Sequence, residues 1–188
     1  MHLGQILQNI GKDYKKIEFR DINFDSKKIK KGDIFFAIKG NKTSGIKFIR
    51  DVVKKKASAI ITDQKVKKSN FDIPMIKVKN VRKSLSEACS NFYKYKPKNL
   101  LAITGTNGKS SVANFFYQIL SLNKTSSASI GTLGIQTKKF KRKTFLTSIN
   151  PLLLHKHLSN LAKKKIQHVI IEASSHGLHQ NRLDFLKF

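Results

Sequence analysis

The alternation of apolar and polar residues divides the first hundred residues into short strands and helices. Four apolar runs with polar boundaries are typical of strands: residues 19–26, 32–40, 57–63 and 73–79. Two further stretches carry apolar residues at helical spacing: residues 45–56 and 81–95. Strands that alternate with helices predict a small α/β domain, which we expect to span residues 1–97 and to end at Pro97.

The same alternation begins again after Pro97. Three apolar runs predict buried strands: residues 99–104, 126–135 and 166–173. Two amphipathic helices are predicted between them, residues 111–120 and 151–165, and we interpret the basic residues 138–145 as an exposed ribbon or loop. This order predicts a mainly parallel sheet in a second α/β domain, residues 98–188. Because such a sheet usually has about five or six strands and the sequence predicts only two or three, we expect only its first part here.

Positive charge dominates the composition. The chain has 38 lysines and arginines against 11 acidic residues, a net charge of +27. Such an excess is typical of nucleic-acid binding, because basic surfaces release counterions from a polyphosphate. However, only five of the basic residues are arginines, and the bidentate guanidinium reads base edges better than lysine does. We therefore interpret the charge as solvated lysine and do not expect a nucleic-acid partner.

The remaining composition indicates the compartment. The single cysteine, Cys89, excludes an internal disulfide and agrees with a reducing environment. Residues 1–16 lack the basic and apolar regions of a signal peptide, and no apolar run approaches the roughly 18–20 residues of a membrane helix. We expect a cytoplasmic protein with no membrane segment, and a monomer.

The stretch "ITGTNGKSSVANFF", residues 103–116, has the pattern of a phosphate-binding loop. A strand, a glycine turn and a helix that opens on Lys109 and Ser110 would point backbone N–H groups at an anion. Lys109 would reach the β and γ oxygens of a nucleotide, and the Ser110 hydroxyl would ligate Mg²⁺. The strict eight-residue motif fails at Ile103, so an ordinary glycine turn before a helix is the alternative.

A second candidate feature is "IIEASSH", residues 170–176. Glu172 is expected at the carboxyl end of a parallel strand, where α/β sheets bind ligands and where a carboxylate can complete a Mg²⁺ shell. The alternative is a solvated glutamate. Ser174 to His176 would form a polar turn beside it. Serine with histidine suggests a hydrolase, but no G-x-S-x-G elbow surrounds them. The other histidines, among them His155 and His157, form no metal set, and we interpret them as ordinary surface or helix residues.

Three separated motifs resemble the Mur ligases. "ITGTNGKSS" is similar to their ATP loop, T-G-T-N-G-K-[ST]-[ST]. Residues 171–188, "IEASSHGLHQNRLDFLKF", resemble E-V-S-S-H-x-L-x-x-x-R-V of the branch that adds the third residue of the peptidoglycan stem. Residues 24–45, "FDSKKIKKGDIFFAIKGNKTSG", resemble the N-terminal D-S-R-x-V-x-x-G-D-x-F-x-A-x-x-G-x-x-x-D-G of that branch. The resemblance covers almost the whole chain.

The resemblance implies a UDP-substrate-binding domain followed by the first part of a P-loop-type ATP-binding domain. It implies an ATP-dependent ligase that adds diaminopimelate or lysine to UDP-N-acetylmuramoyl-L-Ala-D-Glu through an acyl phosphate, with ATP and Mg²⁺ as cofactors. The catalytic residues would be Lys109, Glu172 and His176, and the Mg²⁺ ligands Ser110, Glu172 and His176. The ATP loop would comprise Gly105, Thr106, Asn107, Gly108, Lys109, Ser110 and Ser111. The UDP-sugar contacts would be Phe24, Ser26, Asn41, Lys42, Thr43, Thr147, Ser148, Ser174, Gln180 and Arg182.

The chain departs from the family pattern at several positions. The Asn-Thr-Thr-Pro of the family is "LTSI" here, with Leu146 for the Asn and Ile149 for the Pro, and Lys27 and Ser44 replace an Arg and an Asp. We expect the rest of the ATP domain and the C-terminal amino-acid-binding domain to be absent, and the chain alone to be inactive as a ligase. The alternatives are the sister ligase that adds D-Ala-D-Ala and a basic nucleic-acid-binding P-loop protein.

Overall fold

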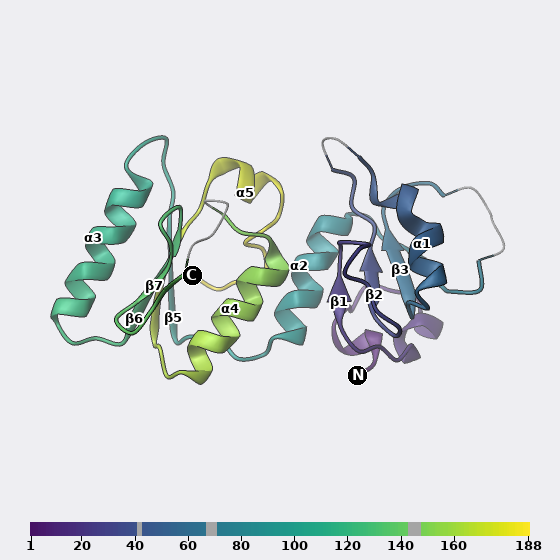
Figure 1. The fold of residues 1–188 in the computed structure, drawn as a ribbon, viewed down its shortest axis with the longest axis horizontal. Coiled ribbons are helices and arrows are strands. Elements are labelled where there is room, and N and C mark those ends of the chain that lie inside the picture. The colour runs from purple at the N-terminus through teal and green to yellow at the C-terminus, as the bar shows by residue number, and fades with distance from the viewer. Residues whose placement is uncertain (41–42, 67–70, 143–147) are drawn as a thin grey trace. The chain divides into compact units, whose positions relative to one another are not determined.

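The computed structural model describes residues 1–40, 43–66, 71–142 and 148–188. The chain forms two compact units, Met1–Phe92 and Tyr93–Phe188, and each combines one sheet with helices (Figure 1). The α/β class predicted from the alternating pattern is confirmed. Within the described ranges, no helix is long and apolar enough to cross a membrane.

The first unit is built on a four-stranded parallel sheet of order β1-β2-β3-β4. Its strands are β1 (Ile22–Asn23), β2 (Ile34–Phe36), β3 (Ala59–Thr62) and β4 (Met75–Lys77). Its helices are α1 (Ile49–Lys54) and α2 (Val81–Phe92), with three 3-10 turns, η1 (Leu3–Gln5), η2 (Lys12–Lys16) and η3 (Gly45–Phe48). The strand pattern at residues 19–26 is therefore realised over two residues only, and the helix expected at 45–56 begins as a 3-10 turn.

Alternation along the strands separates the two faces of this sheet. Phe35 and Ile60 pack with Ile49 and Val52 of α1 in one buried cluster. Successive side chains of a strand point to opposite faces, so Ile34 and Phe36 face the other side. All three residues of β2 are fully buried, which is typical of a parallel strand that is covered on both faces.

The second unit carries a five-stranded mixed sheet of order β5-β9-β6-β7-β8, so the two or three strands expected from the sequence are too few. Its strands are β5 (Asn99–Ile103), β6 (Ser127–Gly131), β7 (Gly134–Thr137), β8 (Lys141–Arg142) and β9 (His168–Glu172). Its helices are α3 (Lys109–Leu122), α4 (Pro151–Lys163) and α5 (Ser175–His179). β5, β9 and β6 are parallel, whereas β7 and β8 are antiparallel additions. The single strand predicted at 126–135 is wrong, because Gly131 and Gly134 turn the chain back into the β6–β7 hairpin.

Helix α4 closes one face of this second sheet. Asn150 caps the helix, its side chain accepting from the N–H of Leu153, and Pro151 takes the first helical position. Leu154, Leu158 and Leu161 repeat at helical spacing and pack on buried strand residues such as Ile171. His155 lies among them and is fully buried, so of the two interpretations, surface or helix residue, the helix residue is confirmed and the surface residue is wrong.

Helix α3 lies on the opposite face (Figure 1), and its apolar stripe is largely uncovered. Ala113 is the buried residue of this helix. Of the five apolar residues that the periodicity places on one face, four are exposed and Leu120 is half-buried: Val112 49%, Phe115 60%, Phe116 38% and Ile119 57% exposed. The 3.6-residue period thus predicts the helix correctly, but the buried face is centred on Ala113, with Ser110, Tyr117 and Leu120 half-buried.

Candidate phosphate and magnesium site

The loop predicted to bind phosphate, called the phosphate loop below, lies between β5 and α3, at the carboxyl end of β5. Gly105 and Gly108 have φ values of +150° and +76°, a left-handed region in which an L side chain would be strained. A Cβ added at Gly108 would meet nothing within 4 Å, so open space adjoins the turn. Helix α3 starts without a side-chain cap, and its first N–H groups are available for an anion. The loop therefore has the shape and the donors that a phosphate needs.

Lys109 closes this loop through its side chain. Its Nζ donates to the carbonyl oxygens of Gly105 at 2.6 Å and of Thr106 at 3.0 Å. Thr106, Asn107 and Ser111 are exposed around it. The ammonium charge is thus held at the loop, where an incoming phosphate would meet it.

Glu172 forms the second half of the site. It ends β9, pairs in register with Ile103 of β5, and is only 2% exposed. The hydroxyl of Ser110, in the first turn of α3, donates to Glu172 Oε2 at 2.9 Å. The predicted metal pair, Ser110 and Glu172, is therefore in direct contact in the structure.

Thr132 completes the hold on this carboxylate, and sequence reasoning missed it. Its N–H donates to Glu172 Oε1 at 3.0 Å and its hydroxyl to Oε2 at 2.9 Å. Gly131 must stay small, because a Cβ there would lie 2.1 Å from Glu172 Oε1. The glycine at 131 inside the strand predicted at 126–135 is the sequence signal that would have indicated a turn at this pair. A buried carboxylate is costly unless donors surround it, and here three donors do so.

A second polar cluster follows β9. Ser148 is 3% exposed, donates to the carbonyl of Glu172 at 3.1 Å, and lies 3.0 Å from the Ser174 hydroxyl. Ser174 caps α5, its hydroxyl accepting from the N–H of Gly177 at 3.1 Å. The polar turn predicted at 174–176 is therefore the start of a short helix.

Arg182 links this cluster to the residues after α5. Its guanidinium donates to the Ser148 carbonyl and, through Nη2 at 2.7 Å, to Gln180 Oε1. The Gln180 amide in turn lies 2.7 Å from His176 Nε2. Four predicted residues, Ser148, His176, Gln180 and Arg182, thus form one chain of contacts beside the phosphate loop.

Several of the residues predicted to contact the UDP-sugar belong to the first unit. The backbone carbonyl of Ser26 accepts from Lys55 Nζ at 2.7 Å, and Ser26 lines a cavity of about 310 Å³ with Lys27 and Phe48. Phe24 is half-buried and Thr43 is exposed. Asn41, Lys42 and Thr147 lie outside the described residues.

The residues present fit both a nucleotide phosphate and Mg²⁺. Magnesium prefers hard oxygen ligands and is usually held by one or two protein groups together with phosphate and water. The Ser110 hydroxyl and Glu172 carboxylate are such oxygens. Among the described residues, no group of three His, Cys, Asp or Glu side chains gathers that could hold a metal by itself. His176 contacts Gln180, and its contribution as a ligand stays a prediction.

Two family models match this chain. The Mur ligase family, catalytic domain, matches residues 18–93, and the Mur ligase middle domain matches residues 103–188. The chain therefore belongs to the Mur ligase family, and the resemblance carried by the three motifs is confirmed.

Three curated relatives that share one name are similar to this chain. A UDP-N-acetylmuramoyl-L-alanyl-D-glutamate--2,6-diaminopimelate ligase of Rickettsia bellii is 43% identical over 145 residues, which are 74% of this chain and 30% of that protein. The ligase of the same name in Rickettsia felis is 41% identical over 143 residues, 74% of this chain and 27% of that protein. In Agrobacterium fabrum the corresponding figures are 40% over 136 residues, 72% and 27%. The chain thus spans about three tenths of the length of the curated relatives it matches.

Solved structures show the same fold. A structure of UDP-N-acetylmuramoyl-L-alanyl-D-glutamate--2,6-diaminopimelate ligase covers 99% of this chain with a TM-score of 0.83 at 25% identity, and this chain covers 38% of it. A MurF ligase from Thermotoga maritima in complex with ADP covers 83% of this chain with a TM-score of 0.52 at 23% identity, and this chain covers 32% of it. The second likeness concerns the fold alone.

Proposed function

We propose that this chain is the UDP-substrate-binding part and the first part of the ATP-binding domain of an ATP-dependent ligase of peptidoglycan precursor synthesis. The ligase would add diaminopimelate to UDP-N-acetylmuramoyl-L-Ala-D-Glu through an acyl phosphate. The single observation that carries the proposal is the contact between Ser110 and Glu172 at the end of a glycine loop. The names of relatives about 40% identical to this chain support the choice of amino acid.

Each residue of the site has a physical role in this proposal. ATP with Mg²⁺, when bound, would supply the phosphoryl group that activates the substrate carboxylate. Gly105 and Gly108 let the backbone approach the phosphates, and the N-terminus of α3 and Lys109 offset their charge. Ser110 and Glu172 would hold the cation, and preorganised charges of this kind supply much of the catalysis in phosphoryl transfer.

The polar cluster at Ser148, Ser174, Gln180 and Arg182 would hold the UDP-sugar substrate. A guanidinium and hydroxyls are fixed donors that suit an anionic, hydroxyl-rich ligand. Ser26 and its neighbours in the first unit would contact the same substrate. We propose a cytoplasmic monomer, since the reaction depends on ATP, and size-exclusion chromatography tests the oligomeric part of this proposal.

Nucleotide binding to the 188-residue chain tests the proposed site directly. Calorimetric titration with Mg²⁺–ATP should give saturable binding, and Lys109→Ala should weaken it by at least about tenfold, because a charge-assisted contact contributes more than about 1.4 kcal/mol. Lys98→Ala is the matched control: it removes the same charge from an exposed position before β5, at the opposite end of that strand. Equal weakening by both variants would reduce the effect to net charge and contradict the proposal.

Substrate binding is tested in the same way with UDP-N-acetylmuramoyl-L-Ala-D-Glu as the titrant. Arg182→Ala and Ser26→Ala should each weaken its binding and leave that of Mg²⁺–ATP unchanged. If either variant weakened both ligands alike, the division into a nucleotide site and a sugar site would be incorrect.

A further inference from the structure

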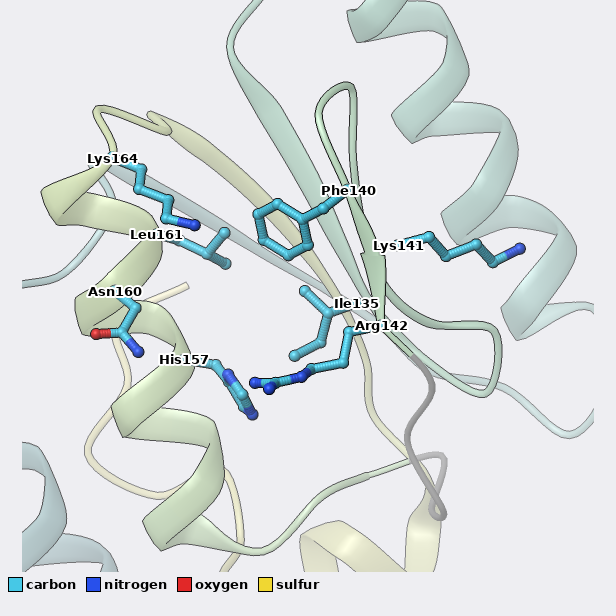
Figure 2. A pocket seen from close by; sticks show the side chains of 8 residues that line it. All are labelled: Ile135, Phe140, Lys141, Arg142, His157, Asn160, Leu161 and Lys164. Atoms are coloured by element: carbon cyan, nitrogen blue, oxygen red, sulfur yellow. The ribbon is translucent and has the colours of Figure 1, made fainter.

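A second cavity, of about 400 Å³, lies between α4 and the β7–β8 hairpin (Figure 2). None of its residues belongs to the site described above. The eight lining residues come from the hairpin, α4 and the position after α4: Ile135, Phe140, Lys141, Arg142, His157, Asn160, Leu161 and Lys164. A volume of several hundred Å³ is typical of small-molecule sites.

The cavity combines an apolar floor with cationic walls. Ile135 and Leu161 are almost fully buried and form the floor. In Figure 2 the guanidinium of Arg142 extends toward the His157 ring, and the Lys164 chain extends toward Phe140, whereas the Lys141 side chain points away from the other residues. The inward-facing cations are therefore Arg142 and Lys164.

These cations are not offset by acidic residues. None of the eight lining residues is acidic. In the sequence of residues 93–188 only Glu172 and Asp184 are acidic, against sixteen lysines and arginines. Glu172 is held by Ser110 and Thr132 at the phosphate loop, and Asp184 accepts from the Asn181 amide at 3.0 Å. Neither carboxylate is among the residues that line the cavity, so the positive potential of the cavity can attract an anionic ligand.

Lys164 and His157 are also positioned rather than loosely solvated. Lys164 Nζ lies 4.5 Å from the centroid of the Phe140 ring, a cation–π contact that orients the ammonium over the cavity. Burial, and then the charges of Arg142 and Lys156, lower the pKa of His157 below its ordinary value. The imidazole is therefore neutral at pH 7, and its ring provides one donor and one acceptor.

We propose that this cavity binds a phosphoryl group, which Arg142 and Lys164 hold from its two sides while Ile135 and Leu161 support an attached carbon body. Two permanent cations match the charge of a phosphate dianion better than that of a single carboxylate. The planar guanidinium fork fits two phosphate oxygens. The Asn160 amide adds a neutral hydrogen-bonding group. The volume exceeds that of a bare phosphate, which favours a phosphate ester over the free ion.

Nuclear magnetic resonance titration of the 188-residue chain tests this proposal, with the His157 ring and the amides of β8 as reporters. The titrants are inorganic phosphate, phenyl phosphate and benzoate. Each titration is repeated with Lys109→Ala, which is expected to weaken binding at the phosphate loop. Phenyl phosphate should shift the His157 ring saturably in both chains and raise its pKa, since a dianion nearby favours the imidazolium over the opposing Arg142, Lys156 and Lys164 charges. If phenyl phosphate binds more tightly than inorganic phosphate, the site is one for phosphate esters. If the two bind equally, the site is one for the free phosphate ion.

Two neighbouring substitutions distinguish specific binding in the cavity from nonspecific attraction by the net positive charge. Arg142→Gln should weaken phosphate binding about tenfold, because it removes a charge-assisted, two-pronged contact. Lys141→Gln removes the same charge one residue away, on a side chain that points out of the cavity, and should weaken binding by less than about twofold, the size of a screened surface effect. Lys164→Gln is the second cavity variant, should Arg142→Gln disturb the hairpin. Shifts that never saturate, equal losses for Lys141 and Arg142, or benzoate bound as tightly as phenyl phosphate would each overturn the proposal.

Discussion

Replacing Gly131 by alanine should dislodge the carboxylate at the centre of the proposed Mg²⁺ site. The added Cβ would lie 2.1 Å from Oε1, 2.2 Å from Cδ and 2.5 Å from Cγ of Glu172, so the carboxylate must leave its position. It would then lose hydrogen bonds to Ser110 and Thr132, which are each 2.9–3.0 Å long. Gly131 has no positive φ, so backbone strain does not complicate the change.

The magnitude follows from the hydrogen bonds involved. A hydrogen bond to a charged group contributes about 1.5–3 kcal/mol, and alanine regains about 0.5–1 kcal/mol over glycine within a strand. If the carboxylate loses the equivalent of two such bonds, the free energy of unfolding of the second unit falls by about 3 kcal/mol. For a unit of this size that corresponds to roughly 10–20 °C in melting temperature.

Amide hydrogen exchange in β6 and β9 is the suitable assay, because it reports on the second unit and is blind to unfolding of the first. The decisive comparison is a double-mutant cycle with Glu172→Ala, which removes all three clashing atoms. In that background Gly131→Ala should change the free energy of opening by less than about 1 kcal/mol. An equal loss in both backgrounds would refute the clash, and a loss below about 1 kcal/mol in the otherwise unchanged chain would refute the tight hold on Glu172.

Three further predictions concern residues outside the proposed site. His155 is fully buried, and neither ring nitrogen has a hydrogen-bond partner among the described residues, so His155→Leu should raise the free energy of unfolding by about 1–2 kcal/mol in urea titrations at pH 7. Burial, with a smaller effect of the Lys96 charge, lowers the pKa of His155 to about 3, so protonation favours the unfolded chain. The free energy of unfolding should therefore decrease as the pH falls from about 6.5 toward 3, and more steeply than in His155→Leu. An equal pH slope in both chains would contradict this assignment. Phe115 and Ile119 are 60% and 57% exposed, so Phe115→Lys and Ile119→Lys should each change stability by less than about 0.5 kcal/mol while raising solubility in precipitation assays; a loss of several kcal/mol would mean that this helix face is buried in solution.

The phosphate loop and Glu172 could be predicted from the sequence because their signals are local. Gly105 and Gly108 before Lys109 specify a tight turn at a helix start, and an apolar run that ends in an acid places Glu172 at a strand end. Thr132 could not be found in this way. It follows Gly131 within what reads as one continuous strand, and only the placement of β6 beside β9 brings it to the carboxylate.

The packing of the helices was harder to predict for a related reason. Helical spacing identifies an apolar stripe but does not say what covers it, and on α3 the sheet contacts Ala113 instead of Phe115. His155 shows the converse. It is polar, yet it belongs to the buried face of α4 itself, because Pro151, Leu154, His155 and Leu158 follow the i, i+3, i+4, i+7 spacing of one helix face.

The self-contained closure of the phosphate loop has a consequence for how fast and how selectively it can be filled. Lys109 already bridges the carbonyls of Gly105 and Thr106, so the turn holds its shape before any anion arrives. An entering phosphate meets backbone N–H groups that are already arranged. It has to displace the Gly105 and Thr106 carbonyls from the Lys109 ammonium group. On binding, Lys109 then changes its hydrogen-bond partners while the turn keeps its conformation. The entropy loss of ordering a flexible segment is avoided. The association rate should therefore be close to the rate of encounter, and selectivity among anions should come from their different dissociation rates.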